Sequence, residues 1–580
     1  MLQTVFSITL IKTKYEINIM KKICSLLLCT LILITIAFVN KTFSQQGSYP
    51  IDSKVNTTFD RTIQPVPVPV TSPSISPDAI AKYSENGYGV WKYGAGLPVE
   101  KRLDLMPDDY SVSTNTAKLL HFFTISDIHI TDKESTAQAI YFGLKGGIIS
   151  AYSAIMLYTT HVLDAAIQTV NELNKKNKID FGISLGDDAN NTQYNELRWF
   201  IDVLDGKEIN PDSGIKDDPV PGPLNDYQDI YKAGGLDKSI PWYSTLGNHD
   251  HFWMGTNPPN DYLRQVYVGD EILQMGNIFE PGGFHKRDFY MGVLDGSTVY
   301  GDAKCYGPVA NTTPLKVPAD ENRRSLTRNE WIGEFLNTSS EPKGHGFNKT
   351  NSETGFANYS FEPKSDLPLK VIVLDDTQSN DDPDIQGYGH GTLDQKRYEW
   401  LINELEKGQK EDKLMIIAAH IPIGVEKPGS FLGWWEKAYV TEDNLISKLN
   451  TYPNLVMWIA GHRHKNTVKA FKSPDPSKPE LGFWQVETSS LREFPQQLRT
   501  FELVRNSDNT LSIFAMNVDP SVKEGSFADI SRSYAIATYE IYKIKAELNP
   551  TGSVSYNAEL VKKLSPEMQK KIQKCGTLIK

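Results

Sequence analysis

The sequence contains few cysteines. Only four occur in 580 residues, and two of them, Cys24 and Cys29, lie in the first 44 residues. If that segment is removed after export, Cys305 and Cys575 remain, and in an oxidising compartment they could pair. The composition therefore excludes a small scaffold held together by several disulfides and leaves one disulfide open.

The chain also lacks an excess of positive charge and, after its N-terminal segment, any long apolar run. The 60 basic residues are outnumbered by 71 acidic ones, which gives a net charge of -11. Nucleic-acid polymers and anionic membranes select clustered Lys and Arg, so neither is expected as a partner. No mid-chain stretch approaches the roughly 20 apolar residues that span a bilayer. The sequence is therefore typical of a globular protein.

One apolar segment stands at the N-terminus. Lys21 and Lys22 precede an apolar run over residues 23–39, and small residues follow at Thr42 and Ser44. This order predicts a signal peptide over residues 1–44 and a periplasmic or secreted protein. Because the run is close to the length of a membrane span, an uncleaved anchor stays open, and it would supply the only membrane contact.

Residues 45–116 are rich in Pro, Ser and Thr and show no sustained helical or strand period. This composition predicts an extended arm. Its Tyr88, Trp91 and Tyr93 would be costly to leave in water, so we expect the arm to pack on the main body.

Short apolar runs alternate with helical patterns over residues 117–518, which predicts an α/β domain. Two turn-rich insertions, at about 205–240 and 251–367, are expected at the rim of the site. A C-terminal extension over residues 519–580 would follow, with a strand pattern at 534–544 and a short amphipathic helix at 565–574.

Polar clusters follow five of the expected strands, at the point where each strand ends. Asp127 and His129 follow residues 119–126, Asp187 follows 179–185, Asn248-His249-Asp250 follows 241–246, His420 follows 414–419, and His462 and His464 follow 455–460. In open α/β sheets, ligands bind in the crevice beyond the carboxyl ends of the strands. We therefore expect these side chains to meet.

The residue types in these clusters are those of a transition-metal site. Because side chains alternate along a strand, Asp127 and His129 are expected on one face, and likewise His462 and His464. Carboxylate oxygen together with imidazole nitrogen suits Zn, Fe or Mn, whereas Mg or Ca would rarely be given four histidines. Gly186, Gly247 and Gly461 are expected to let the chain turn sharply before each ligand.

The order of these motifs is informative. Asp-X-His, Gly-Asp, Gly-Asn-His-Asp, a single His and Gly-His-X-His follow one another over about residues 119–518, and together they resemble the calcineurin-like metallophosphoesterase superfamily. Residues 86–91 and 126–132 are similar to an exported bacterial subgroup of these enzymes. The resemblance implies an α/β fold, a four-layer α-β-β-α sandwich, here with long insertions, an N-terminal arm and a C-terminal extension.

The resemblance also implies two divalent metal ions, with Mn, Fe or Zn favoured, and a set of ligands for each. One ion would be held by Asp127, His129 and His464. The other would be held by Asn248, His420 and His462. Asp187 would bridge them.

The expected activity is the hydrolysis of phosphate esters by a metal-bridging hydroxide, which two close metal ions generate near neutral pH. The resemblance makes His249 the acid that protonates the leaving group, with Asp250 as its orienting partner; the alternative is that His249 only packs beside the turn. Asp188 is expected to be a supporting or solvated carboxylate, and His251, His285, His345 and His390 are expected to be ordinary polar groups of the loops.

Several functions stay open. The substrate is expected to be a small-molecule or lipid phosphate ester, as a monoester or a diester. The alternatives are cleavage of a diphosphate linkage, or a catalytically silent binding protein with the same fold. Position 190 is Asn, where the resemblance would require Tyr in a purple acid phosphatase, so that class is disfavoured. The oligomeric state is not indicated.

Overall fold

The structure is a computed structural model, and it describes residues 50–52, 54–111, 115–146, 152–214, 228–277, 280, 282–295, 298, 300–377, 391, 393–424, 439–542 and 556–579. The expected signal peptide or anchor over residues 1–44 lies outside these ranges, as does His390. Within the described ranges, no helix combines the length and hydrophobicity that a membrane span requires.

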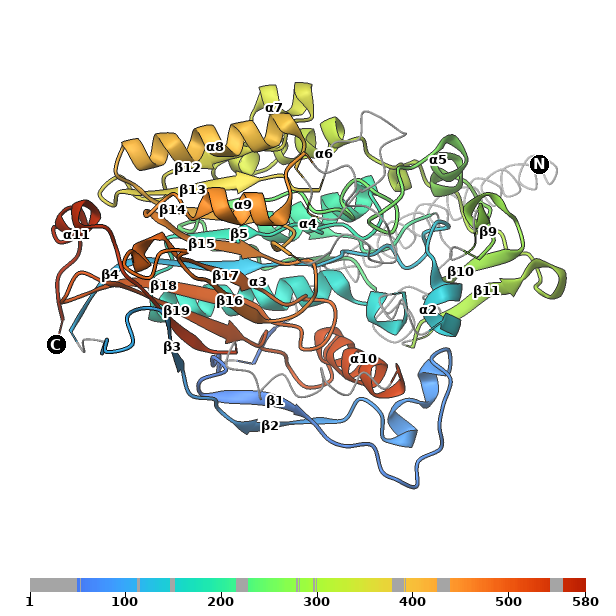
Figure 1. Cartoon of the computed structure of the whole chain (residues 1–580). Helices are drawn as coiled ribbons and strands as arrows, with labels where there is room; N and C mark the ends of the chain where they lie inside the picture. The colour runs from blue at the N-terminus through green and yellow to red at the C-terminus, as the bar shows by residue number, and fades with distance from the viewer. Residues whose placement is uncertain are drawn as a thin grey trace, which may run out of the picture.

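Two large mixed sheets occupy the centre of the molecule (Figure 1). The seven-stranded sheet runs in the order β3 (Glu100–Leu105), β20 (Ala558–Lys562), β19 (Leu511–Val518), β18 (Leu498–Asn506), β4 (Thr116–Ile125), β5 (Phe181–Ser184) and β8 (Trp242–Ser244). The six-stranded sheet runs in the order β12 (Tyr359–Phe361), β13 (Leu369–Leu374), β14 (Leu414–Ala419), β15 (Leu455–Ala460), β17 (Phe483–Glu487) and β16 (Thr467–Phe471).

Aromatic side chains join the inner faces of the two sheets. Phe122 on β4 stacks on Phe181 of β5 and on Phe501 of β18, with ring centroids 4.7 and 4.9 Å apart. Phe181 in turn meets Phe361 of β12, in the other sheet, edge to face at 5.4 Å. These rings and their neighbours belong to one buried core that draws side chains from both sheets.

Helices cover the outer faces. Leu401 and Leu405 of α8 (Gln395–Lys410) and Leu445 and Leu449 of α9 (Glu442–Leu449) are buried with outward-facing residues of the six-stranded sheet. Helices α3 (Thr159–Lys176) and α4 (Tyr194–Asp205) bury apolar side chains in the core that contains the strands of the seven-stranded sheet. The layers therefore follow one another as helix, sheet, sheet, helix, and the expected four-layer sandwich is confirmed.

One element expected from the sequence is wrong. Residues 534–544 were expected as a strand, but Tyr534 to Tyr542 form the second half of helix α10 (Phe527–Tyr542), whose end lies at the limit of the described residues. Ala535, Ile536 and Ala537 are all fully buried. A helix that is buried on most of its faces loses the 3.6-residue period that would identify it. The short helix expected near the C-terminus is present as α11 (Pro566–Ile572).

The arm lies along α10 and ends in the sandwich. It forms a two-stranded antiparallel sheet of β1 (Arg61–Pro65) and β2 (Trp91–Ala95), and the Gly89 amide donates to Glu540 Oε2 at 2.7 Å. Strand β3 then pairs in parallel with β20 at the edge of the seven-stranded sheet. Segments that the sequence assigned to an arm and to a C-terminal extension thus supply two strands of the sandwich.

The remaining elements lie mostly in the insertions or beside them. They are α2 (Ile140–Gly146), β6 (Glu208–Ile209), β7 (Tyr231–Lys232), α5 (Asp261–Val268), β9 (Gln274–Met275), β10 (Phe289–Asp295), β11 (Asp302–Pro308), α6 (Arg328–Phe335) and α7 (Lys349–Thr354). Cys305 and Cys575 are both free thiols, so the disulfide left open by the sequence is not formed.

Candidate metal centre

Five strands end at the same place in the sandwich. β4, β5 and β8 are parallel neighbours in one sheet, and β14 and β15 are parallel neighbours in the other. Parallel neighbours present their carboxyl ends at one edge. The structure brings together there all seven side chains expected as ligands: Asp127, His129, Asp187, Asn248, His420, His462 and His464.

The backbone at these positions is unusual. Asp127, His129 and Asp187 have φ values of 50°, 48° and 56°, and the two histidines of the Gly-His-X-His motif have 71° and 57°. Non-glycine residues rarely adopt this left-handed region, and such strain is concentrated at functional sites. The expectation that strand alternation aligns each pair is therefore wrong: β4 ends at Ile125, and left-handed turns beyond it direct the side chains inward.

Glycine is required here for two different reasons. Gly186 has a φ of +95°, as a sharp turn needs. Gly461 does not have a positive φ, but a Cβ there would lie 1.8 Å from Ser126 Oγ and 2.5 Å from Asp127 Oδ2. The chain before His462 thus passes so close to the Asp127 loop that a side chain cannot be accommodated.

One group of donor atoms comes from Asp127, His129 and His464. His464 Nε2 lies 3.2 Å from Asp127 Oδ1 and 3.2 Å from His129 Nε2. Two imidazole nitrogens about 2.1 Å from one ion would be about 3.0–3.4 Å apart, so this spacing fits a shared metal ion. All three donors lie within 4.8 Å of one another; Asp127 and His129 are buried, and His464 is partly exposed.

A second group surrounds the amide oxygen of Asn248. Asn248 Oδ1 lies 2.8 Å from His420 Nε2 and 3.2 Å from His462 Nδ1. Asp187 Oδ2 lies 3.3 Å from His420 Nε2 and 3.5 Å from His129 Nε2, so it contacts both groups. Donors of these types at these spacings fit divalent metal ions.

The electrostatics of the site favour positive charge. Burial opposes protonation of His420, but the Asp187 and Asp127 carboxylates outweigh it and raise the pKa of His420 to about 10. Burial likewise opposes protonation of His464, and Glu493 and Asp127 raise its pKa to about 10. A site that stabilises added protons in this way also stabilises a bound cation.

Sequence comparison identifies the family. A model of the family described as Calcineurin-like phosphoesterase matches residues 120–466, which is more than half of the chain. The chain belongs to this family. It is therefore a phosphoester hydrolase.

Two solved structures resemble this phosphoesterase at low sequence identity. A dimetal phosphatase from Danio rerio is similar at 10% identity and a TM-score of 0.36, over 70% of this chain and all of the other. A putative 5'-nucleotidase from Staphylococcus aureus, in complex with alpha-ketoglutarate, is similar at 13% identity and a TM-score of 0.29, over 70% of this chain and 55% of the other. No curated protein matches the chain.

Glu493 is a supporting residue of the phosphoesterase that the sequence did not reveal. It accepts a hydrogen bond from His464 Nδ1, which leaves Nε2 of the same ring facing Asp127. A carboxylate behind a histidine ligand fixes its tautomer and raises its basicity. Glu493 carries no motif, and only the fold places it beside His464.

We expect Glu493→Gln to weaken metal binding about 10–100-fold, because the His464 ring loses its charged partner. Titration of metal-free protein with Zn or Mn, followed by calorimetry, measures this affinity. Glu559→Gln is a matched control, since Glu559 is buried and accepts from Ser512 Oγ on β19, outside the metal centre. Equal metal affinities in the wild type, Glu493→Gln and Glu559→Gln would contradict the supporting role of Glu493 behind His464.

The surroundings of His249 differ from those expected. His249 Nδ1 donates to the Asn190 carbonyl at 2.9 Å, and the His249 amide donates to Asp187 Oδ1 at 2.8 Å. Asp250, expected to orient the ring, instead accepts from the backbone amides of Asp187, Ala189 and Gly247. The prediction that Asp250 orients the His249 ring is therefore wrong. The Asp250 carboxylate holds the turns at Asp187 and Asn248 together, and the Asn190 carbonyl orients the His249 ring.

The other polar residues considered from the sequence are structural or exposed. Asp188 is buried and accepts from the hydroxyls of Ser184 and Ser244; burial raises its pKa to about 7. His251 is hydrogen-bonded to Thr377 and His345 to the Trp242 carbonyl, both in buried positions, whereas His285 is exposed.

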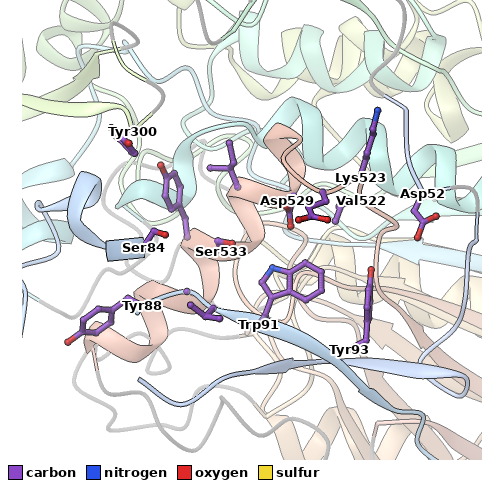
Figure 2. A pocket seen from close by; sticks show the side chains of 15 residues that line it. Asp52, Ser84, Tyr88, Trp91, Tyr93, Tyr300, Val522, Lys523, Asp529 and Ser533 are labelled. Atoms are coloured by element: carbon purple, nitrogen blue, oxygen red, sulfur yellow. The ribbon is translucent and has the colours of Figure 1, made fainter. Parts of the chain in front are cut away.

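A cavity of about 740 Å³ lies away from this centre, between the arm and α10 (Figure 2). Trp91 and Tyr93 from β2, together with Asp529 and Ser533 from α10, contribute to its wall. None of the seven expected ligands lines it. The cavity is therefore separate from the metal centre.

Proposed function

We propose that the phosphoesterase hydrolyses small-molecule or lipid phosphate esters with two divalent metal ions, bound by the two donor groups described above and bridged by Asp187. The observation that supports this proposal best is the convergence of seven donors from five strand ends, with Asp187 Oδ2 within 3.5 Å of a histidine nitrogen in each group. When bound, two such ions lower the pKa of a shared water and stabilise charge on the oxygens around phosphorus.

The charges of the protein side chains suit a phosphate. Two divalent ions would bring four positive charges, against which Asp127 and Asp187 supply only two negative ones. Asn248 offers an oxygen without cancelling more of the charge. The pocket thus stays positive and attracts an anionic ester.

In this proposal, His249 gives a proton to the leaving group. Its Nδ1 is engaged by Asn190, and its ring lies 4.6 Å from that of His129, edge to face. Nε2 is then the nitrogen left to exchange a proton in the site. Burial lowers the pKa of His249. A negatively charged ester favours the imidazolium form, so binding of the ester would promote protonation of His249.

A direct test uses metal-free protein and two synthetic esters, p-nitrophenyl phosphate and bis-p-nitrophenyl phosphate. We expect at least one ester to be hydrolysed after addition of Mn, Zn or Fe, and chelation to lower the rate at least about 100-fold because the ions supply several kcal/mol of transition-state stabilisation. Hydrolysis that is insensitive to chelators would contradict the proposal. If the metal-loaded protein cleaves neither ester but does cleave a diphosphate, a natural substrate with a diphosphate linkage is favoured. If it cleaves none of these compounds, a catalytically silent binding protein is favoured.

A further inference from the structure

Arg492 is a buried cation beside the metal centre for which neither the motifs nor the catalytic proposal has a function. It follows β17 and is 2% exposed. Its amide donates to Ser490 Oγ at 2.9 Å, and that hydroxyl donates to the Asp127 carbonyl at 2.7 Å. The Arg492 backbone is thus fixed to the loop that presents Asp127.

The guanidinium of Arg492 has a hydrogen-bond partner at only one of its three nitrogens. Nη1 donates to Asn190 Oδ1 at 2.6 Å, whereas Nε and Nη2 are buried and have no hydrogen-bond partner. Nε and Nη2 lie on one edge of the planar group, and this edge matches two oxygens of a carboxylate or phosphate. Leaving two charged donors unpaired in a buried position is costly, and beside the metal centre, unlike at other buried arginines, a bound anionic substrate would be within reach to complete them.

Asn190 connects this cation to the catalytic histidine. Its carbonyl accepts from His249 Nδ1, and its side-chain oxygen accepts from Arg492 Nη1. Arg492 therefore lies close enough to act on whatever binds in the site.

We propose that the Nε–Nη2 edge of Arg492 binds two oxygens of the phosphoryl group and makes the enzyme selective for phosphomonoesters. This inference rests on the proposed function. A monoester has three non-ester oxygens, so two can pair with Arg492 while one remains for the metal ions. A diester has only two, so pairing both leaves none. The second negative charge of a monoester also favours a site with an added cation.

The test compares Arg492→Lys and Arg492→Met with Arg532→Met. Arg532 is a matched control, because it is 2% exposed, donates Nη2 to the Pro520 carbonyl, leaves Nε and Nη1 without partners, and lies on α10 under Trp91. For the metal-loaded proteins, calorimetry gives the affinity for inorganic phosphate, steady-state kinetics give kcat/KM for both nitrophenyl esters, and elemental analysis gives the metal content.

We expect Arg492→Met to weaken phosphate binding and to lower kcat/KM for p-nitrophenyl phosphate about 100-fold each, since two charge-assisted hydrogen bonds are lost. The loss for bis-p-nitrophenyl phosphate should stay below about 5-fold. Lysine keeps the charge without the paired donors, so Arg492→Lys should recover only part of the loss. Added guanidinium ion should restore p-nitrophenyl phosphate hydrolysis in Arg492→Met, and Arg532→Met should match the wild type.

Two results would overturn the inference. One is an unchanged affinity for phosphate in Arg492→Met, and the other is an equal loss of kcat/KM for the two esters. Either result would contradict the selective binding of monoesters by Arg492, while the proposed hydrolysis would stand. If the wild-type protein cleaves neither ester, the proposed function fails, and the affinity for inorganic phosphate alone then decides whether Arg492 binds a phosphoryl group.

Discussion

Asp187→Asn is expected to lower kcat by about 10³–10⁴-fold, because it weakens both metal-binding groups at once and metal ions supply several kcal/mol of transition-state stabilisation. The Asp187 carboxylate lies between His129 and His420 and also accepts from the His249 amide. Asparagine keeps the shape of the side chain but loses the negative charge and one acceptor oxygen. Elemental analysis of the variant should show fewer bound ions, and steady-state kinetics give the rate.

The adjacent Asp188→Asn is the control for this variant. Asp188 is equally buried, but its carboxylate faces Ser184 and Ser244 and not the histidines. Burial raises the pKa of Asp188 to about 7, so a large part of this carboxyl is already neutral near pH 7. We expect a change of less than about 10-fold, because the altered hydrogen bonds join Asp188 to serine hydroxyls and not to the metal-binding groups. Comparable losses in the two variants would rule out the bridging position of Asp187.

His249→Ala is expected to lower kcat by about 10²–10⁴-fold, which is the usual contribution of a positioned acid. Metal content should stay at the wild-type level, because the seven proposed ligands remain. The pH profile gives a second measurement. Burial lowers the pKa of His249 below its ordinary value, so kcat/KM, which reports the free enzyme, should decline as pH rises through that lowered pKa. This limb should be absent from the variant.

His285→Ala serves as the matched histidine control, since His285 is exposed and lies outside the metal centre. Its kinetics and pH profile should equal those of the wild type. If His249→Ala loses metal ions in proportion to its loss of rate, His249 is a ligand or a structural support and not the acid.

Local patterns in the sequence were sufficient to predict the strands that carry the site. β14 and β15 begin and end where their apolar runs do, and the ends of β4 and β5 lie within one to three residues of theirs. A strand buried on both faces is a continuous apolar run, and the polar residue that follows marks its end. Helix α8 keeps an exposed face and therefore a 3.6-residue apolar period, whereas α10 is buried on most of its faces and does not.

The sequence alone determined which residue types stand at the ends of the five strands, in which order, and therefore the family and the ligands to be expected. The tertiary structure decided how they meet. Left-handed turns at Asp127 and His129, and not strand alternation, aim the side chains. Glu493 contacts His464 across 29 positions of the sequence, and Asn190 contacts Arg492 across 302 positions. Such contacts have no local period or motif, because they arise only when segments distant in the sequence become neighbours in the fold.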